Sequence, residues 1–139
     1  MANGSIATNY TRSLISAYLA GLTVYLGVGT GTATPANADT ALGTEVTTGA
    51  LGGSGTYTRP GSFTGAQVTT NVTNDTVQWG PSTPTTWTNP AGSANTIPVT
   101  EAAIFSAPTA GSMYYRTVFS VFNVAPGFGI QVQASIVAQ

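Results

Sequence analysis

The sequence contains no cysteine, no histidine and no lysine, and only 5 % of its 139 residues are charged. An ordinary soluble domain has about a quarter of its residues charged. Without Cys or His the chain excludes disulfide scaffolds, Cys/His zinc sites and Cys–His or Ser–His catalysis. These absences remove most enzyme classes, so the sequence predicts a protein that is not an enzyme and has no metal site and no cofactor.

The charged residues that are present are dispersed along the chain. They are Arg12, Arg59, Arg116, Asp39, Glu45, Asp75 and Glu101. A nucleic-acid binder needs clustered cations to neutralise phosphates, so we expect no nucleic-acid partner. Nothing in the spacing pairs two carboxylates for glycosidase chemistry. The sequence instead favours loop-capping roles for the two aspartates and ion pairs between the glutamates and arginines.

The chain nevertheless has enough apolar residues for a core, since 42 % of it is hydrophobic. Its surface must then consist largely of Thr, Ser, Asn, Gln and Gly. A net charge of -1 gives little repulsion between copies of the chain. The composition therefore indicates an oligomer or an assembly component, with copies of itself among its partners.

One segment superficially resembles a signal peptide. Residues 13–29 are largely apolar, Arg12 precedes them, and small residues lie near Ala38. However, Ser16 and Gly21 interrupt the segment, and a membrane span needs about 20 predominantly apolar residues without such breaks. We expect neither secretion nor a membrane span.

The N-terminal part predicts one helix followed by a strand. Residues 8–20 suit a helix that Asn9 or Thr11 could cap and Gly21 would end. Its three- and four-residue spacing places one set of side chains on a common face: Leu14, Ala17, Tyr18 and Leu22. Residues 22–28 predict a strand, 30–43 a loop, and 45–47 a short edge strand.

The remaining chain predicts short strands separated by Pro- and Gly-containing turns. These strands are 66–72, 76–79, 96–105, 113–122 and 130–137, with a loop at 80–95 that holds Trp87. Apolar and polar residues alternate in the last strand, which favours one buried face. The pattern predicts an all-β fold, an antiparallel β-sandwich or jelly roll with a short N-terminal helix. We expect one domain over 1–139, with the N-terminal arm and helix covering about 1–21.

Two arginines stand next to aromatic residues, Arg59 after Tyr57 and Arg116 after Tyr114 and Tyr115. Arginines and tyrosines of this kind are frequent in protein interfaces, which makes these residues candidate interface residues. The alternative is an ion pair within the domain, with Glu45 or Glu101 as partner and stacking on tyrosine.

Trp79 and Trp87 are further interface candidates. If exposed, they could form a platform that stacks on carbohydrate. The alternative is one Trp in the core and one that covers a loop or a subunit interface. Gly29 and Gly31 weakly suggest a phosphate loop, but neither a helix signal nor a lysine follows them.

Several segments carry a resemblance that spans nearly the whole chain. They are LTVYLGVGTGTATPANADTALGTEV at 22–46, YTR at 57–59, VTEAAIFSAPTAGSMYYRTVFS at 99–120 and VAPGFGIQVQASIV at 124–137. The chain resembles small virion proteins of tailed bacteriophages that are labelled head decoration, head-fibre or tail-fibre proteins. It departs from that pattern at Ser106 and Phe128, where the family often has Asp, and at Glu101, where an aromatic residue or His is common.

The resemblance implies a non-enzymatic virion structural protein that is located in the virion. The first hypothesis is a capsid decoration or cement protein that braces major capsid subunits. The second is a trimeric tail-fibre or baseplate module. The third, from a different class, is a secreted carbohydrate-binding β-sandwich that uses both tryptophans.

Overall fold

In the computed structural model the chain forms two compact units. Unit 1 contains residues 1–23, 63–83 and 133–139, and unit 2 contains 24–62 and 84–132. The structure describes residues 7–46, 59, 63–80 and 85–138, with backbone alone at 85–87. The described regular structure is mostly antiparallel β-sheet with one N-terminal helix, which confirms the all-β class. The expectation of a single domain stays a prediction.

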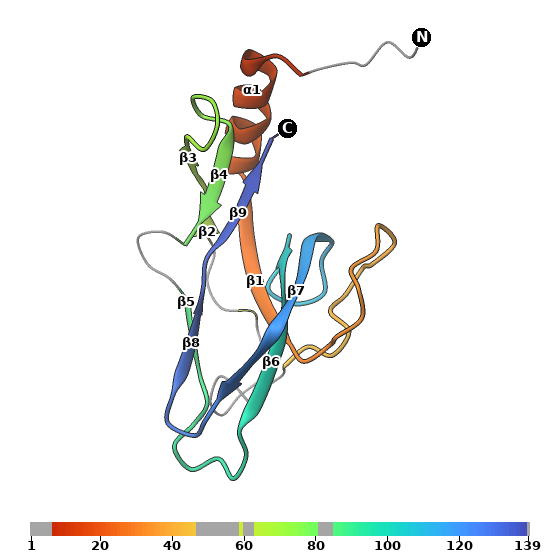
Figure 1. The fold of residues 1–139 in the computed structure, drawn as a ribbon, viewed down its shortest axis with the longest axis vertical. Helices are drawn as coiled ribbons and strands as arrows, with labels where there is room; N and C mark the ends of the chain where they lie inside the picture. The colour runs from red at the N-terminus through yellow and green to blue at the C-terminus, as the bar shows by residue number, and fades with distance from the viewer. Residues whose placement is uncertain (1–6, 47–58, 60–62, 81–84, 139) are drawn as a thin grey trace. The chain divides into compact units, whose positions relative to one another are not determined.

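Unit 1 combines the helix with a small sheet. Helix α1 (Asn9–Ala20) contacts β3 (Ala66–Val68) and β4 (Thr76–Trp79), and β9 (Ala134–Val137) pairs with the other edge of β4. Both strand pairs are antiparallel, and Figure 1 shows α1 beside this sheet. The two-residue strand β2 (Phe63–Thr64) precedes β3.

The predicted end of α1 is confirmed, but its predicted cap is wrong. Thr8 is the N-cap, and its Oγ1 accepts a hydrogen bond of 3.2 Å from the backbone N–H of Thr11. Asn9 is already helical, so it cannot provide the cap. Gly21 ends the helix, and its N–H donates to the carbonyl of Ala17 at 3.2 Å.

The side of α1 that contacts the sheet is polar. Ser16 is fully buried, and its hydroxyl donates to Ser13 O and contacts Asn74 O. Gln67 of β3 donates from Nε2 to Ser16 Oγ at 2.7 Å. Tyr18 lies on the face that the three- and four-residue spacing predicts to be apolar, yet it is 72 % exposed. Hydrogen bonding, rather than apolar packing, therefore sets which side of this helix is buried.

Unit 2 is built on three antiparallel strands in the order β1–β6–β7. These are β1 (Thr23–Gly29), β6 (Ile97–Phe105) and β7 (Met113–Val124), and Figure 1 shows β6 and β7 as a long twisted hairpin. A second pair joins β5 (Thr85–Thr88) to β8 (Gly129–Val132).

The core of unit 2 surrounds β6, which is buried at every position except Pro98. Val24, Leu26 and Ile104 lie on one face of the sheet and are almost completely buried. On the opposite face Leu42, from the long loop after β1, packs with Ala103 and Phe105, and Tyr25 and Met113 border this cluster. Because the loop after β1 covers this second face, β6 is buried on both faces over almost its whole length.

Predictions for three strands and one loop need correction. The predicted strand 130–137 is divided after Val132, because β8 pairs with β5 while β9 pairs with β4. The predicted loop 80–95 contains β5, and the predicted strand 66–72 ends at Val68, where a turn begins. The predicted edge strand 45–47 is a single bridge between Glu45 and Gly29 within the described residues, and position 47 lies outside them.

The apolar segment 13–29 is divided between α1, which has only 12 residues, and β1. Among the described residues, no helix combines the length and hydropathy that crossing a bilayer requires.

Candidate functional site

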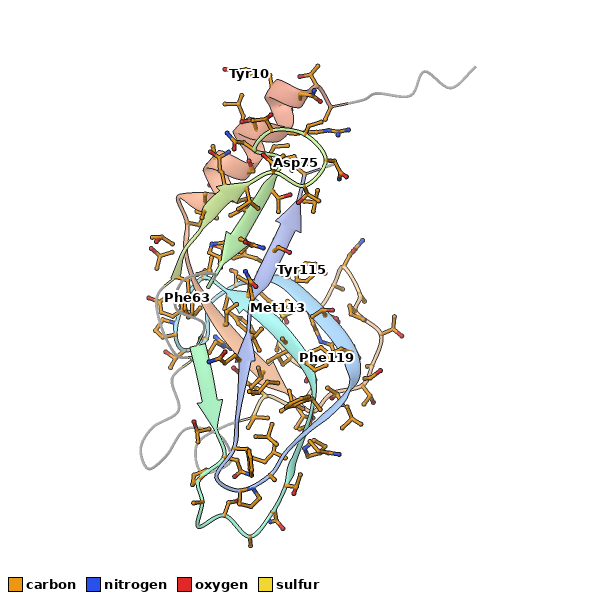
Figure 2. All side chains as sticks on the ribbon, turned by 60° about the vertical axis from the view of Figure 1, so that its left-hand side comes forward. Tyr10, Phe63, Asp75, Met113, Tyr115 and Phe119 are labelled. Carbon is orange, nitrogen blue, oxygen red and sulfur yellow. The ribbon has the colours of Figure 1, made fainter. Side chains whose placement is uncertain are left out.

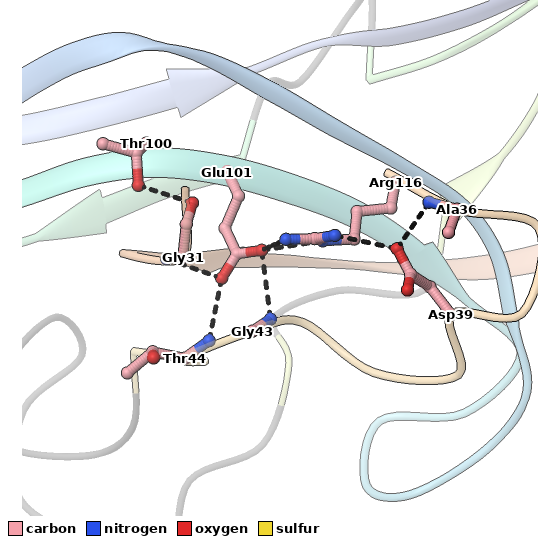
Figure 3. A network of polar contacts seen from close by, with 8 residues as sticks. All are labelled: Gly31, Ala36, Asp39, Gly43, Thr44, Thr100, Glu101 and Arg116. Atoms are coloured by element: carbon pink, nitrogen blue, oxygen red, sulfur yellow. Dashed lines mark hydrogen bonds and ion pairs between the residues drawn. The ribbon is translucent and has the colours of Figure 1, made fainter. Parts of the chain in front are cut away.

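A buried carboxylate in unit 2 joins a strand to the loop after β1 (Figure 3). Glu101, on β6, is fully buried, and its Oε1 accepts hydrogen bonds from Gly31 N at 2.8 Å and Thr44 N at 2.9 Å. Its Oε2 accepts from Gly43 N at 3.1 Å and from Arg116 Nε at 2.8 Å. Burial alone would raise the pKa of Glu101. The hydrogen bonds outweigh burial and hold that pKa below its ordinary value, so the group stays ionised.

The glycines near this carboxylate are explained by close approach. A Cβ at Gly31 would lie 2.5 Å from Glu101 Oε1, and one at Gly29 would also overlap that oxygen. The backbone N–H of Gly31 therefore binds an internal carboxylate. This is the local geometry that the sequence weakly suggested as a phosphate loop, and here the anion is part of the chain.

Arg116, on β7, lies between two carboxylates, as Figure 3 shows. Its Nη2 is 2.8 Å from Glu101 Oε2, and its Nη1 donates to Asp39 Oδ2 at 2.8 Å. Asp39 Oδ2 also accepts from Ala36 N at 2.9 Å. The hydrogen bond from Ala36, followed by that from Arg116, lowers the pKa of Asp39. The guanidinium therefore links β6, β7 and the loop after β1.

The second buried arginine forms a separate ion pair. Arg59 Nε donates to Glu45 Oε1 at 2.8 Å and Nη2 donates to Oε2 at 3.0 Å, a bidentate arrangement. Arg59 Nη1 donates to the carbonyls of Ala107 and Ala110, and the guanidinium lies 3.4 Å from the centroid of the Phe105 ring. The ion pairs expected within the domain are thus present for both glutamates, with phenylalanine in place of tyrosine under Arg59.

Unit 1 has its own buried carboxylate, Asp75, in the turn before β4 (Figure 2). It accepts backbone hydrogen bonds from Thr70, Asn71 and Val72 at 2.8 to 3.1 Å, and one from the Thr76 hydroxyl. Desolvation acts to raise the pKa of Asp75, but these hydrogen bonds dominate and lower it. The loop-capping role expected from the sequence is confirmed.

A cleft of about 490 Å³ opens beside Arg116 within unit 2. One wall comes from the loop after β1 and consists of Pro35, Ala36, Asn37 and Asp39. The other consists of the first four residues of β7, Met113, Tyr114, Tyr115 and Arg116. Tyr114 and Tyr115 are 50 % and 47 % exposed, whereas Arg116 is buried. Tyr114, Tyr115 and Arg116 of the second wall are candidates from the sequence, whereas Met113 and the cleft itself are not. The first wall comes from a loop in which Asp39 lies 77 residues before Arg116.

The two tryptophans proposed from the sequence lie in different strands. Trp79 is 1 % exposed and belongs to the core of unit 1 with Val77, so it offers no surface to a sugar. The backbone of Trp87 pairs with Ile130 in the β5–β8 ladder, and its side chain lies outside the described residues. The structure therefore brings Tyr114, Tyr115 and Arg116 together at one cleft and places Arg59 and Trp79 elsewhere.

Several large apolar side chains are exposed on α1 and β7 and in the turn before β8. They are Tyr10, Leu14, Ile15, Tyr18, Tyr114, Tyr115, Val121, Phe122 and Phe128. Figure 2 shows Tyr10 at the start of the helix. The described residues thus combine buried charged groups with exposed apolar groups.

No group of three or more acidic side chains within the described residues is arranged to hold a metal ion. No protein-family model matches this chain, and the search of curated proteins finds no relative. The expectation of a non-enzymatic protein without cofactor stays a prediction.

Proposed function

We propose that this chain is a non-enzymatic structural protein of a tailed-phage virion, a capsid decoration protein that braces major capsid subunits. Its partners are the major capsid protein and further copies of itself, and its architecture is that of an antiparallel β-sandwich with jelly-roll connections. The observation that carries the proposal is the outer edge of β7.

Strand β7 has twelve residues and, among the described residues, a hydrogen-bonded neighbour only on its β6 side. Residues 120–123 are exposed one after another, including Val121 and Phe122. Natural proteins usually protect such an edge with Lys, Pro or a covering loop. The only charged residue of β7 is Arg116, which is buried and paired. An edge that the described residues leave uncovered supports a strand that a neighbouring subunit covers.

The distribution of charge supports the same proposal. Asp39, Glu45, Asp75 and Glu101 all accept internal hydrogen bonds, and two of the three arginines are paired with three of these acids. Contacts to neighbours must then rest on apolar burial and backbone hydrogen bonds, which salt weakens little. Repetition over many copies turns modest contacts into a strong brace.

The test is cryo-electron microscopy of the intact virion with icosahedral averaging. The proposal predicts density for a 14.0 kDa subunit on every capsomer or at every local symmetry axis. A head that contains only major capsid protein would overturn it, and density confined to the tail would support the tail module instead.

A paired variant links that density to β7. Phe122→Lys places a charge at the free edge, whereas Phe128→Lys makes the same exchange at an exposed position in the turn before β8. Occupancy of the head should fall for the first and remain for the second. Equal occupancy for both would exclude the β7 edge as the contact.

A further inference from the structure

The cleft beside Arg116 has the size of a small-molecule site, and its lining combines aromatic and polar residues. Its volume of about 490 Å³ falls within the range of about 300–1,000 Å³ that is typical of ligand pockets. Such pockets present apolar and aromatic surface with a few fixed polar groups. Here the aromatic surface comes from Tyr114 and Tyr115, and the polar groups are Asp39 and Asn37.

A β-bulge explains how two consecutive tyrosines line one cleft. In the β6–β7 ladder Tyr115 is paired with Ile104 and Met113 with Phe105, so Tyr114 is an extra residue without a partner on β6. Consecutive residues of a regular strand point to opposite faces, but a bulge redirects a side chain. Both tyrosines line the cleft, and each side chain is about half exposed, so a ligand in the cleft can reach an aromatic ring.

Asp39 supplies an oriented hydrogen-bond acceptor. Its Oδ2 is held by Ala36 N and by Arg116 Nη1, while Oδ1 has no partner among the described residues. Arg116 is itself fixed by Glu101, so the carboxylate is positioned before any ligand arrives. The lowered pKa keeps Asp39 ionised at neutral pH, and an ionised acceptor makes strong hydrogen bonds to hydroxyl groups.

The charge of the lining favours an uncharged ligand. Asp39 is paired at 2.8 Å with Arg116, which it shares with Glu101, and Asp39 and Arg116 are the only two charged side chains of the lining within the described residues. A cation would meet the guanidinium and an anion would meet the carboxylate. A compound with an apolar ring face and hydroxyl donors satisfies both the tyrosines and Asp39, and the exposed amide of Asn37 can both donate and accept.

We propose that this cleft binds a neutral sugar ring, stacked on Tyr114 or Tyr115 and hydrogen-bonded to Asp39. This inference goes beyond the proposed structural role and does not depend on it. It also moves carbohydrate recognition away from the tryptophans, since Trp79 is buried.

The experiment is a titration of the full chain, followed by ¹H–¹⁵N correlation spectra, with glucose, galactose, mannose and N-acetylglucosamine. Glucosamine, N-acetylneuraminic acid and arginine serve as charged probes. The proposal predicts saturable shifts at the amides of residues 36–39 and 113–116 with at least one neutral sugar and weaker binding of the charged probes. Shifts elsewhere only, no saturable binding of any neutral sugar, or tighter binding of a charged probe would overturn it.

Variants of the full chain test the stacking. Tyr114→Ala and Tyr115→Ala remove the two rings one at a time, and loss of the ring that stacks should weaken binding about two- to tenfold. Tyr114→Phe and Tyr115→Phe keep the rings and should retain most of the affinity. Tyr18→Ala removes an exposed tyrosine from α1 and should change nothing. Undiminished affinity in both β7 alanine variants, or the same loss in Tyr18→Ala, would contradict the proposal.

Discussion

Asp75 in unit 1 and Glu101 in unit 2 are both fully buried carboxylates that accept three backbone hydrogen bonds, yet they act over different lengths of chain. The donors to Asp75 lie three to five residues before it. Those to Glu101 lie 57 to 70 residues before it. The first carboxylate shapes one turn, whereas the second holds a distant loop against a sheet.

Of these two carboxylates, Glu101 has a cation and Asp75 has none among the described residues. Asp75 instead accepts a further hydrogen bond from the adjacent Thr76 hydroxyl. Glu101 is buried in the middle strand of a sheet, where a charge without a counterion is costly. Arg116 donates hydrogen bonds to Glu101 and to Asp39, so one guanidinium connects the middle strand, the outer strand and the loop.

Glu101→Gln should cause the largest loss of folding stability. This change keeps the shape but leaves Arg116 with one partner fewer, and removing one member of a buried ion pair typically costs about 3–5 kcal/mol. We expect the free energy of unfolding, measured with urea, to fall by about 3 kcal/mol. Hydrogen exchange should accelerate at the amides of Gly31, Gly43 and Thr44.

The double variant Glu101→Gln with Arg116→Met is the matched control, because it removes both charges. It should be more stable than the sum of the two single changes implies, since Glu101→Gln leaves Arg116 with Asp39 alone and Arg116→Met leaves Glu101 without a cation. Strict additivity would show that the pair makes no coupled contribution.

Gly31→Ala should disturb the contacts of Glu101 from the loop after β1. The added Cβ would overlap Glu101 Oε1, and overpacking of this kind costs about 1–3 kcal/mol. Gly92→Ala is the control, since nothing lies within 4 Å of a Cβ there. Thermal unfolding should show a lower midpoint for the first variant and little change for the second, and equal midpoints would contradict the close approach.

Asp75→Asn should have a smaller and more local effect. The amide keeps one acceptor oxygen, so part of the turn survives, and the loss of stability should be less than that of Glu101→Gln. Faster hydrogen exchange should be confined to Thr70, Asn71 and Val72. Acceleration in the loop bound to Glu101 would contradict the local role of this carboxylate.

Low pH should lower the folding stability of the protein by protonating its hydrogen-bonded carboxylates. The pKa values of Asp39, Asp75 and Glu101 are all lowered in the folded state, so the unfolded chain binds protons first as pH falls. Their contribution to stability is complete above the ordinary carboxyl values of about 4 and is lost as pH falls below them. With no histidine, urea midpoints should stay constant from about pH 7 to 5 and then decline. A decline that starts near neutrality would contradict this account.

Sequence patterns located the elements that depend on local signals. The strand 76–79 and the C-terminal end of α1 at Gly21 are confirmed, because β-branched residues and a terminal glycine act within a few positions. The buried side of α1 was missed because it depends on the Ser16–Gln67 hydrogen bond. The division between β8 and β9 was missed because alternation continues through Gln133 while the pairing partners change.

The candidate site was foreseen only in part. The adjacency of Tyr114, Tyr115 and Arg116 is visible in the sequence, and ion pairs between arginines and glutamates follow from the scarcity of charge. The bulge at Tyr114 and the opposite wall at Asp39 are tertiary features, since they arise from the register of β6 against β7 and from a loop closed by Glu101. The glycines near Glu101 were the one local sign of that closure.

We propose that charge stabilises the interior of this protein while its contacts with neighbours are apolar. The most direct test of this proposal is sedimentation velocity of the purified full chain across protein concentration at low and high sodium chloride. We predict self-association that persists or strengthens at high salt and is reduced by Phe122→Lys. A chain that stays monomeric at every concentration, or an assembly that dissociates as salt rises, would contradict the account.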